Sequence, residues 1–169
     1  QDQLFQARPQ KTVALYPGSV WATKKWTPEG YAHVAQQLIS KGYRVCLMGA
    51  PSDQNDAAMI KRKVPQVQDL TGQMSLCESA FYIQNFDLVI CNDSAPAHMA
   101  ASLGRPVLCI FGPTVLDFGF RPWNDLSQVV EINHLECRPC GPHGHTQCPL
   151  GHHDCMKKID PNKVTQTAL

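Results

Sequence analysis

The sequence predicts an α/β fold, a Rossmann-like doubly wound parallel sheet of about six strands, and three observations lead to it. Between Thr12 and Gly112, short apolar runs alternate with stretches of helical periodicity, which is typical of parallel strands joined by helical crossovers. Some runs, such as residues 88–91, are apolar throughout, as strands buried on both faces are. The length of 169 residues suits one domain whose core needs no metal or disulfide.

The first strand is expected at residues 12–17 (TVALYP), and the first helix within residues 27–42 (TPEGYAHVAQQLISKG). Thr27 is a good N-cap, Pro28 suits the first helical position, and Gly42 suits the position after the last turn. Apolar residues recur at helical spacing along one face: Tyr31, Val34, Ala35, Leu38 and Ile39. These signals together predict an amphipathic helix that packs on the sheet.

The later elements continue the alternation. Further strands are expected at residues 43–49, 67–72, 87–93, 106–112 and 129–132. Further helices are expected at residues 52–63, 75–86 and 94–104, and from residue 160 onward. Ser75 and Glu78 have the spacing of a capping box, and Ser94 is a good N-cap with Pro96 in the first turn. Each of these two helices therefore has a defined start.

Composition limits the classes of partner. A formal net charge of +1 without a Lys/Arg-rich stripe argues against nucleic acid. No apolar run approaches the roughly 18 residues needed to cross a bilayer, and the start is not signal-like. Residues 1–11 are expected to be a linker or a disordered start, and residues 12–169 one domain. Because the chain begins without Met, a fragment or processed product is expected. Cysteine usage favours a reducing, cytoplasmic setting.

Polar or small residues follow four of the predicted strands where each strand ends. They are Gly18 and Ser19, residues 49–53, residues 93–98 and residues 112–114. Each group alone is also explained by a turn or a helix cap. Because the carboxyl ends of parallel strands share one edge of a sheet, the four groups together favour a ligand cleft at that edge.

The expected ligand carries phosphate. A helix N-terminus, with free N–H groups and about half a positive charge, follows Asp93 and Ser94. Lys24 and Lys25 in the loop after the first strand supply positive charge, although one of them is expected to be a solvated surface residue. Asp53 is placed to accept hydrogen bonds from ribose hydroxyls, as the acidic residue of dinucleotide folds does.

Other well-known phosphate motifs are missing from the sequence. No G-x-G-x-x-G follows the first strand, which argues against NAD, and no G-x-x-x-x-G-K-[ST] is present, which argues against a P-loop NTPase. No Asp-x-Asp pair is available to hold Mg²⁺. We therefore expect that catalysis requires no cofactor and that lysine and backbone dipoles neutralise the phosphate charge.

Several stretches occur in a specific combination and order. They are YPGSVWATKKWTPEGYAHVAQQL, VCLMGAPSD, LTGQMSLCESAFYIQNFDLVICNDSAPAHMAASLGRPVLCIFGPT, and the cysteine-rich run from CRPC to CPLGHHDCM. With these stretches the chain resembles the carboxy-terminal half of glycosyltransferase family 9, the ADP-heptose:lipopolysaccharide heptosyltransferases, nearest the heptosyltransferase II type. The resemblance covers roughly residues 12–165.

The resemblance implies a binding site for a nucleotide-sugar donor. Lys24 matches the lysine that engages the donor's phosphates and sugar, and Asp93 matches the aspartate that contacts the heptose. These two are the catalytic residues expected in this chain. Ser19 matches a hydroxyl residue near the pyrophosphate, Asp53 the acidic residue at the ribose, and Met74 a residue against the adenine.

One motif of the resemblance departs from the family pattern. Asp93, Ser94 and His98 match Asp-Ser/Thr-Gly-x-x-His, in which the backbone after the aspartate holds phosphate. Ala95 stands where glycine is usual, so its methyl group is expected to weaken donor binding or to shift it. His98 is expected to be a phosphate-side donor or a buried spacer beneath Asp93. A histidine one turn into an alanine-rich helix is equally explained as a packing residue.

The resemblance also implies one half of a two-domain, type-B glycosyltransferase. The second domain would hold the donor, and the first would hold the acceptor and supply the general base. The expected reaction is an inverting transfer of heptose from ADP-heptose to the lipopolysaccharide inner core, at the cytoplasmic face of the inner membrane. This chain alone is expected to bind donor and to lack most activity. The alternative is a stand-alone nucleotide or nucleotide-sugar binding module without catalysis.

The eight cysteines fall into two groups. Cys46, Cys91 and Cys109 in strand-like runs and Cys77 in a helix-like run are expected to be buried, reduced thiols. The others form C-x₂-C-x₇-C-x₆-C within a Cys/His-rich segment, residues 137–155: Cys137, Cys140, Cys148 and Cys155. Four thiolates could hold a structural zinc ion; disulfides, an iron–sulfur cluster and free thiols are the alternatives. In every case the segment is expected to be structural and away from the binding edge.

Overall fold

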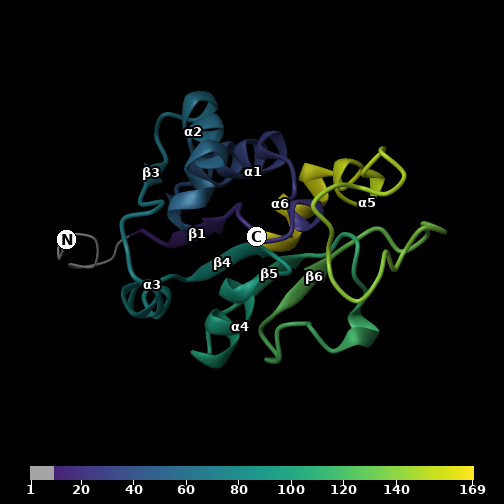
Figure 1. The fold of residues 1–169 in the computed structure, drawn as a ribbon. Helices are drawn as coiled ribbons and strands as arrows, with labels where there is room; N and C mark the ends of the chain where they lie inside the picture. Colours follow the sequence, from purple (N-terminus) through teal and green to yellow (C-terminus); the bar gives the residue numbers. More distant parts are fainter. Residues whose placement is uncertain (1–9) are drawn as a thin grey trace.

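The computed structural model describes residues 10–169 and contains one sheet of six parallel strands. The strand order is β3-β2-β1-β4-β5-β6. The strands are β1 (Thr12–Tyr16), β2 (Arg44–Leu47), β3 (Gln68–Asp69), β4 (Leu88–Asn92), β5 (Val107–Ile110) and β6 (Gln128–Val130). Every neighbouring pair is parallel, which confirms the predicted α/β sheet of six strands (Figure 1).

Helices cover both faces of this sheet (Figure 1). On one face lie α1 (Pro28–Ser40), α2 (Gln54–Lys63) and α6 (Pro161–Ala168), and on the other lie α3 (Leu76–Ile83) and α4 (Ala95–Ser102). A short helix, α5 (Asp154–Lys157), precedes α6. Three single 3-10 turns are η2 (Ala22–Lys24), η3 (Pro51–Asp53) and η4 (Leu116–Phe118). Buried apolar side chains fill both layers, as a doubly wound fold requires.

The predicted helix starts are confirmed. The Thr27 side chain accepts a hydrogen bond from the Gly30 amide at 3.1 Å, and α1 begins at Pro28. At α3 the Ser75 amide donates to the Glu78 carboxylate at 2.8 Å while the Glu78 amide donates to Ser75 Oγ at 3.3 Å. These bonds satisfy N–H groups that a helix leaves without partners in its first turn.

The chain reverses its winding direction between β1 and β4. From β1 it moves outward to β2 and β3, and then returns to β4 on the other side of β1. In open α/β sheets, ligands bind beyond the carboxyl ends of the strands at such a switch point. The residues after β1 and β4 are therefore the first place to look for a site.

Residues 1–9 of the predicted linker lie outside the described residues. Three features of the described elements differ from the sequence predictions. The last strand ends at Val130 rather than at residue 132, and α5 was not predicted. Cys77, expected to be buried, is exposed because it lies on the outer side of α3. None of the helices described between residues 10 and 169 combines the length and hydropathy needed to span a bilayer.

Candidate donor-binding cleft

Two adjoining cavities open at the carboxyl ends of β1 and β4. The charged cavity, of about 380 Å³, contains Lys24, Asp93 and His98. The nucleoside-sized cavity, of about 330 Å³, contains Asp53 and Met74. Residues that line both are Ser19, Val20, Ser94 and Ala95. Together the two cavities form one cleft, which brings together every binding residue predicted from the sequence.

A buried ion pair lies in the charged cavity. Lys24 Nζ is 2.5 Å from Asp93 Oδ2, and the two residues are 8% and 4% exposed. The same carboxylate oxygen accepts a hydrogen bond from Thr114 Oγ1 at 2.7 Å, and Lys24 Nζ lies 5.7 Å from the centre of the Phe120 ring. Lys24 and Thr114 thus both bond to Oδ2 of Asp93.

Asn92, the last residue of β4, holds the loops beside this pair. Its side-chain amide donates to the carbonyls of Pro17 and Gly18 at 2.8 and 3.1 Å. Its Oδ1 accepts from the Trp26 amide at 3.0 Å and from the Tyr31 hydroxyl at 3.1 Å. Asn92 is completely buried, and its side-chain hydrogen bonds join the end of β4 to the exit of β1 and to the start of α1.

The N-terminus of α4 faces both cavities. Ser94, the N-cap residue, is extended and makes no side-chain bond to the first turn of α4. Pro96 has no N–H and the Ala97 amide donates to the Ser94 carbonyl at 3.0 Å, so this end of the helix offers the Ala95 amide and the positive end of the helix dipole to an anion. His98 is exposed one turn later and lines the charged cavity, so the expectation of a buried spacer or packing residue is wrong.

Asp53 and Gly18 form the boundary between the nucleoside-sized cavity and the exit of β1. The Asp53 carboxylate accepts from the Ala50 amide at 2.9 Å and from Ser52 Oγ at 3.4 Å. A Cβ atom at Gly18 would lie 2.2 Å from that carboxylate, so only glycine leaves room for it there. The carboxylate is thus fixed toward the cavity wall where a ribose is expected.

The two loop lysines have different surroundings. Lys25 Nζ pairs with Asp56 Oδ2 of α2 at 2.9 Å, and Lys25 does not line either cavity. Lys24, at the end of η2, is the lysine that enters the cleft. Sequence reasoning assigned one of the two to the surface, and the structure identifies which one.

Several lining residues were not predicted from the sequence. In the charged cavity they include Val20, Trp21, Phe120 and His143; in the nucleoside-sized cavity they include Leu76, Ser79 and Met99. Leu76, Ser79 and Met99 lie near predicted site residues along the chain, and this proximity was the available signal for them. His143 lies in the Cys/His-rich segment, and no local signal in the sequence connects it to Lys24.

The position of the Cys/His-rich segment corrects another prediction. We expected this segment to lie away from the binding edge, but it packs against η2, which carries Lys24. The Thr23 amide donates to the His145 carbonyl at 3.0 Å, and the His143 ring stacks on Trp21 with 5.8 Å between ring centres. The segment therefore forms one wall of the charged cavity.

All eight cysteines are free thiols in this structure. Within residues 10–169, no three His, Cys, Asp or Glu side chains are grouped so that they could hold a metal ion. The arrangement of Cys137, Cys140, Cys148 and Cys155 therefore does not fit a bound zinc ion without a rearrangement of the sulfurs. The structural zinc stays a prediction, which metal analysis of the purified protein checks.

The free thiols are expected to react with iodoacetamide at pH 8 in the order of their exposure. Cys77 is exposed and should be modified first. Burial raises the pKa of Cys46 and Cys155 to about 11, so little thiolate is present at pH 8 and both should react slowly. Mass spectrometry of peptides over time measures the order. Rapid modification of Cys46 would contradict the described core, and a bound metal would instead protect Cys137 and Cys140.

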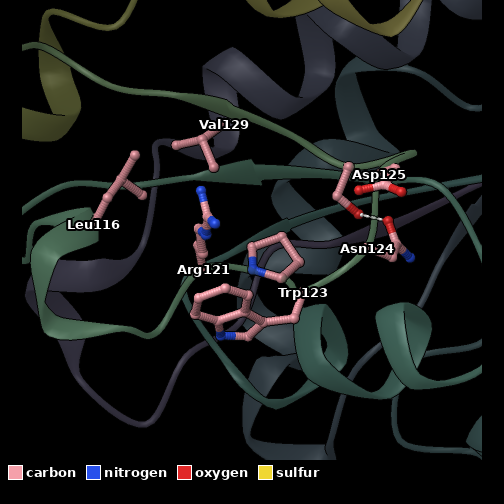
Figure 2. Close-up of a pocket in the computed structure, with 8 residues that line it drawn as sticks. Leu116, Arg121, Trp123, Asn124, Asp125 and Val129 are labelled. Carbon is pink, nitrogen blue, oxygen red and sulfur yellow. Dashed lines mark hydrogen bonds between the residues drawn. The ribbon is translucent and has the colours of Figure 1, made fainter.

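A larger groove, of about 670 Å³, lies beside β6 (Figure 2). Arg121 stacks over the Trp123 ring, with its guanidinium carbon 4.4 Å from the ring centre. The side-chain amide of Asn124 is occupied by the carbonyls of Ala101 and Arg105. The charged residues of this groove, Arg121 and Asp125, are exposed. A buried ion pair is the rarer and more informative feature, so the cleft is the better candidate site.

Comparison with known proteins shows which family the chain resembles. The model of glycosyltransferase family 9 (heptosyltransferase) matches residues 1–152. Lipooligosaccharide heptosyltransferase 2 of Campylobacter jejuni is 30% identical over 175 residues, which cover 99% of this chain and 53% of that protein. Lipopolysaccharide heptosyltransferase 2 of Escherichia coli K12 is 32% identical over 112 residues, covering 63% of this chain and 32% of that protein.

Solved structures of heptosyltransferases are also similar to this chain. The structure of E. coli ADP-heptose lipopolysaccharide heptosyltransferase II matches with a TM-score of 0.80 and 25% identity, covering 99% of this chain and 48% of that chain. E. coli heptosyltransferase WaaC with ADP matches in fold, with a TM-score of 0.71, 21% identity, and coverage of 98% and 46%. The chain spans about half the length of these heptosyltransferases.

Proposed function

Because this chain belongs to glycosyltransferase family 9, the heptosyltransferase family, we propose that it is the carboxy-terminal, donor-binding half of an enzyme that transfers heptose from ADP-heptose to the lipopolysaccharide inner core. The observation that carries the proposal is the buried Lys24–Asp93 pair beside the free N-terminus of α4. Both features suit a pyrophosphate. Heptosyltransferase WaaC has been solved with ADP and with ADP-2-deoxy-2-fluoro heptose, and these ligands motivate the choice of donor.

The nucleotide would occupy the cleft from end to end. Adenosine would occupy the nucleoside-sized cavity, with Met74 against the base and Asp53 accepting from the ribose. The pyrophosphate would then lie by Ser19 and the N-terminus of α4, and the heptose in the charged cavity. His98, exposed on the same helix, is positioned to donate to a phosphate oxygen.

The chemical role of this half would be to stabilise the leaving group. As the bond between the anomeric carbon and the phosphate oxygen breaks, negative charge grows on the departing ADP. Lys24 has three N–H donors and uses one on Asp93, so the others can bind the phosphate. Asp93 Oδ1 would accept from a heptose hydroxyl and orient the sugar. The acceptor and the general base would come from the other half, at the cytoplasmic face of the inner membrane.

We expect this chain to bind ADP and ADP-heptose without a divalent cation, because Lys24 and the N-terminus of α4 supply the positive charge. Isothermal titration calorimetry with ADP, ADP-heptose, UDP and GDP, each with MgCl₂ or with EDTA, measures this. The ADP compounds should bind equally well in both buffers and more tightly than UDP or GDP. Loss of ADP binding in EDTA, with the fold intact, would contradict the expectation.

The division of labour between the two halves has its own test. This chain alone should bind ADP-heptose but transfer no heptose, and transfer should appear when the other half of the enzyme is supplied. Turnover can be followed by release of ADP in the presence of a lipopolysaccharide core acceptor. If the two halves together bind donor but never transfer, the alternative of a nucleotide-sugar binding module without catalysis is favoured.

A further inference from the structure

The contacts of the Cys/His-rich segment concentrate on the neighbours of the two charged residues in the cleft. Thr23 precedes Lys24 and is 5% exposed. Its amide and hydroxyl both donate to the His145 carbonyl, at 3.0 and 3.1 Å, and its hydroxyl oxygen accepts from the His145 amide at 2.7 Å. The His153 ring lies within hydrogen-bond distance of the Thr23 carbonyl, at 2.7 Å. All polar groups of Thr23 are therefore bound by this one segment.

The backbone of the segment is shaped for these contacts. His153 has a φ of 57°, and it is the one non-glycine residue with positive φ within the part of the chain that the structure describes. Such a conformation costs free energy and persists where surrounding contacts hold it. A Cβ atom at Gly144 would lie 2.6 Å from Trp21 Cβ and 3.0 Å from Lys24 Cγ. Gly144 therefore lets the segment lie directly against the stem of Lys24.

The same segment also reaches Asp93. Arg138, whose side chain is 5% exposed, donates to the Thr114 carbonyl at 2.6 Å and pairs with Glu131 at 2.7 Å. Thr114 in turn donates from its hydroxyl to Asp93 Oδ2 at 2.7 Å. Arg138 thus fixes the backbone of the residue that bonds directly to Asp93.

Cys140 connects the contacts near Lys24 with those near Asp93. Its amide donates to the Pro113 carbonyl at 2.8 Å, and its carbonyl accepts from the His145 ring. The contacts therefore form a closed loop from Lys24 through Thr23, His145 and Cys140 to Pro113, and through Thr114 back to Asp93. A closed loop of contacts around one ion pair can determine the geometry of that pair. A structural segment distant from the cleft could not do so.

We propose that the Cys/His-rich segment positions the Lys24–Asp93 pair for the donor's pyrophosphate, with Thr23, His145 and Arg138 as positioning residues that act through Lys24 and Asp93. This inference rests on the proposed function, since it assumes that the pair meets the phosphates. It assigns to the segment a role in donor affinity in addition to any role in stability. It also predicts that the nucleoside part of the donor, which binds away from the pair, is insensitive to the segment.

Two substitutions test the proposal in this chain. Thr23→Val keeps the shape and removes the hydroxyl. Gly144→Ala places a methyl group 2.6 Å from Trp21 Cβ and 3.0 Å from Lys24 Cγ and Thr23 Oγ1, so the segment must move away from Lys24. Each should weaken ADP binding about three- to tenfold, the scale of one or two lost hydrogen bonds, and leave adenosine binding unchanged. Thr23→Ser keeps the hydroxyl and should bind ADP like the parent. Thr146→Val, at an exposed threonine of the same segment, is the matched control.

The readouts separate positioning from folding. Calorimetry measures ADP, ligand-detected NMR measures adenosine, and thermal melts report stability. In a Lys24→Ala background, Thr23→Val should cause little further loss of ADP binding, because its effect passes through Lys24. The inference is overturned if Thr23→Val and Gly144→Ala weaken the binding of ADP and of adenosine equally. It is also overturned if both variants bind ADP like the parent. In either case the proposed function stands. If Thr23→Val fails to fold, the ADP and adenosine affinities of Gly144→Ala test the inference instead. A parent that binds no ADP would overturn the proposed function itself.

Discussion

Replacing Lys24 by alanine is expected to weaken ADP binding to this chain by about 5- to 150-fold, which corresponds to about 1–3 kcal/mol. Lys24 is the buried cation of the charged cavity, and its removal takes away a charge-assisted hydrogen bond to phosphate. It also leaves the Asp93 carboxylate buried without its ion-pair partner and facing an anionic ligand. The loss of attraction and the new repulsion act in the same direction. Calorimetry with ADP measures the change.

The neighbouring lysine supplies the control for this experiment. Lys25→Ala removes the same charge one residue away, but Lys25 pairs with Asp56 outside the cleft, so ADP affinity should change little. Asp93→Ala should bind ADP but mainly impair heptose transfer once both halves of the enzyme are present, because Asp93 faces the sugar. If Lys24→Ala and Asp93→Ala bound and turned over like the parent, the proposed cleft would be in the wrong place.

Replacing Asn92 by alanine is expected to lower the free energy of unfolding by about 3–5 kcal/mol, a large part of the roughly 5–15 kcal/mol typical of such domains. The substitution leaves the carbonyls of Pro17 and Gly18, the Trp26 amide and the Tyr31 hydroxyl without their Asn92 bonds. The single proton of the Tyr31 hydroxyl lies within reach of both Asn92 Oδ1 and the Tyr16 carbonyl, each at 3.1 Å, so Tyr31 can still donate to Tyr16. Partial relaxation restores other bonds, so the four losses do not add fully. Urea titration followed by circular dichroism measures the change.

Two further variants make this result specific. Asn92→Asp keeps the shape and the acceptor but removes the donors and places a carboxylate by two carbonyls, so it should also be strongly destabilising. Gln147→Ala, at an exposed residue, should leave the free energy of unfolding within about 0.5 kcal/mol of the parent. A loss for Asn92→Ala no greater than for Gln147→Ala would show that the described network does not hold the loops of the cleft.

The sequence by itself determined the elements whose signals are local. Thr27, Pro28 and Gly42 bracket α1, and Ser75 with Glu78 starts α3, because capping bonds join residues within one turn. The alternation of apolar runs with helical patterns determined the parallel sheet. A shared sheet edge then predicted that the residues after the strands lie together. The resemblance pointed to Lys24 after β1, Asp53 after β2, Met74 after β3 and Asp93 after β4.

Only the tertiary structure decided the contacts between segments far apart in the chain. Thr23 and His145 are separated by 122 residues and Lys24 and Asp93 by 69, and no periodic pattern encodes such pairs. The tertiary structure therefore showed that Lys24 rather than Lys25 enters the cleft and that Cys77 lies on the surface. It also showed that the Cys/His-rich segment packs at the cleft. The glycines, prolines and histidines of the Cys/His-rich segment show neither helical nor strand periodicity. The path of this segment therefore depends on the residues it contacts, which are Thr23, Thr114 and Trp21. These contact residues come within reach of the segment only when the sheet has formed.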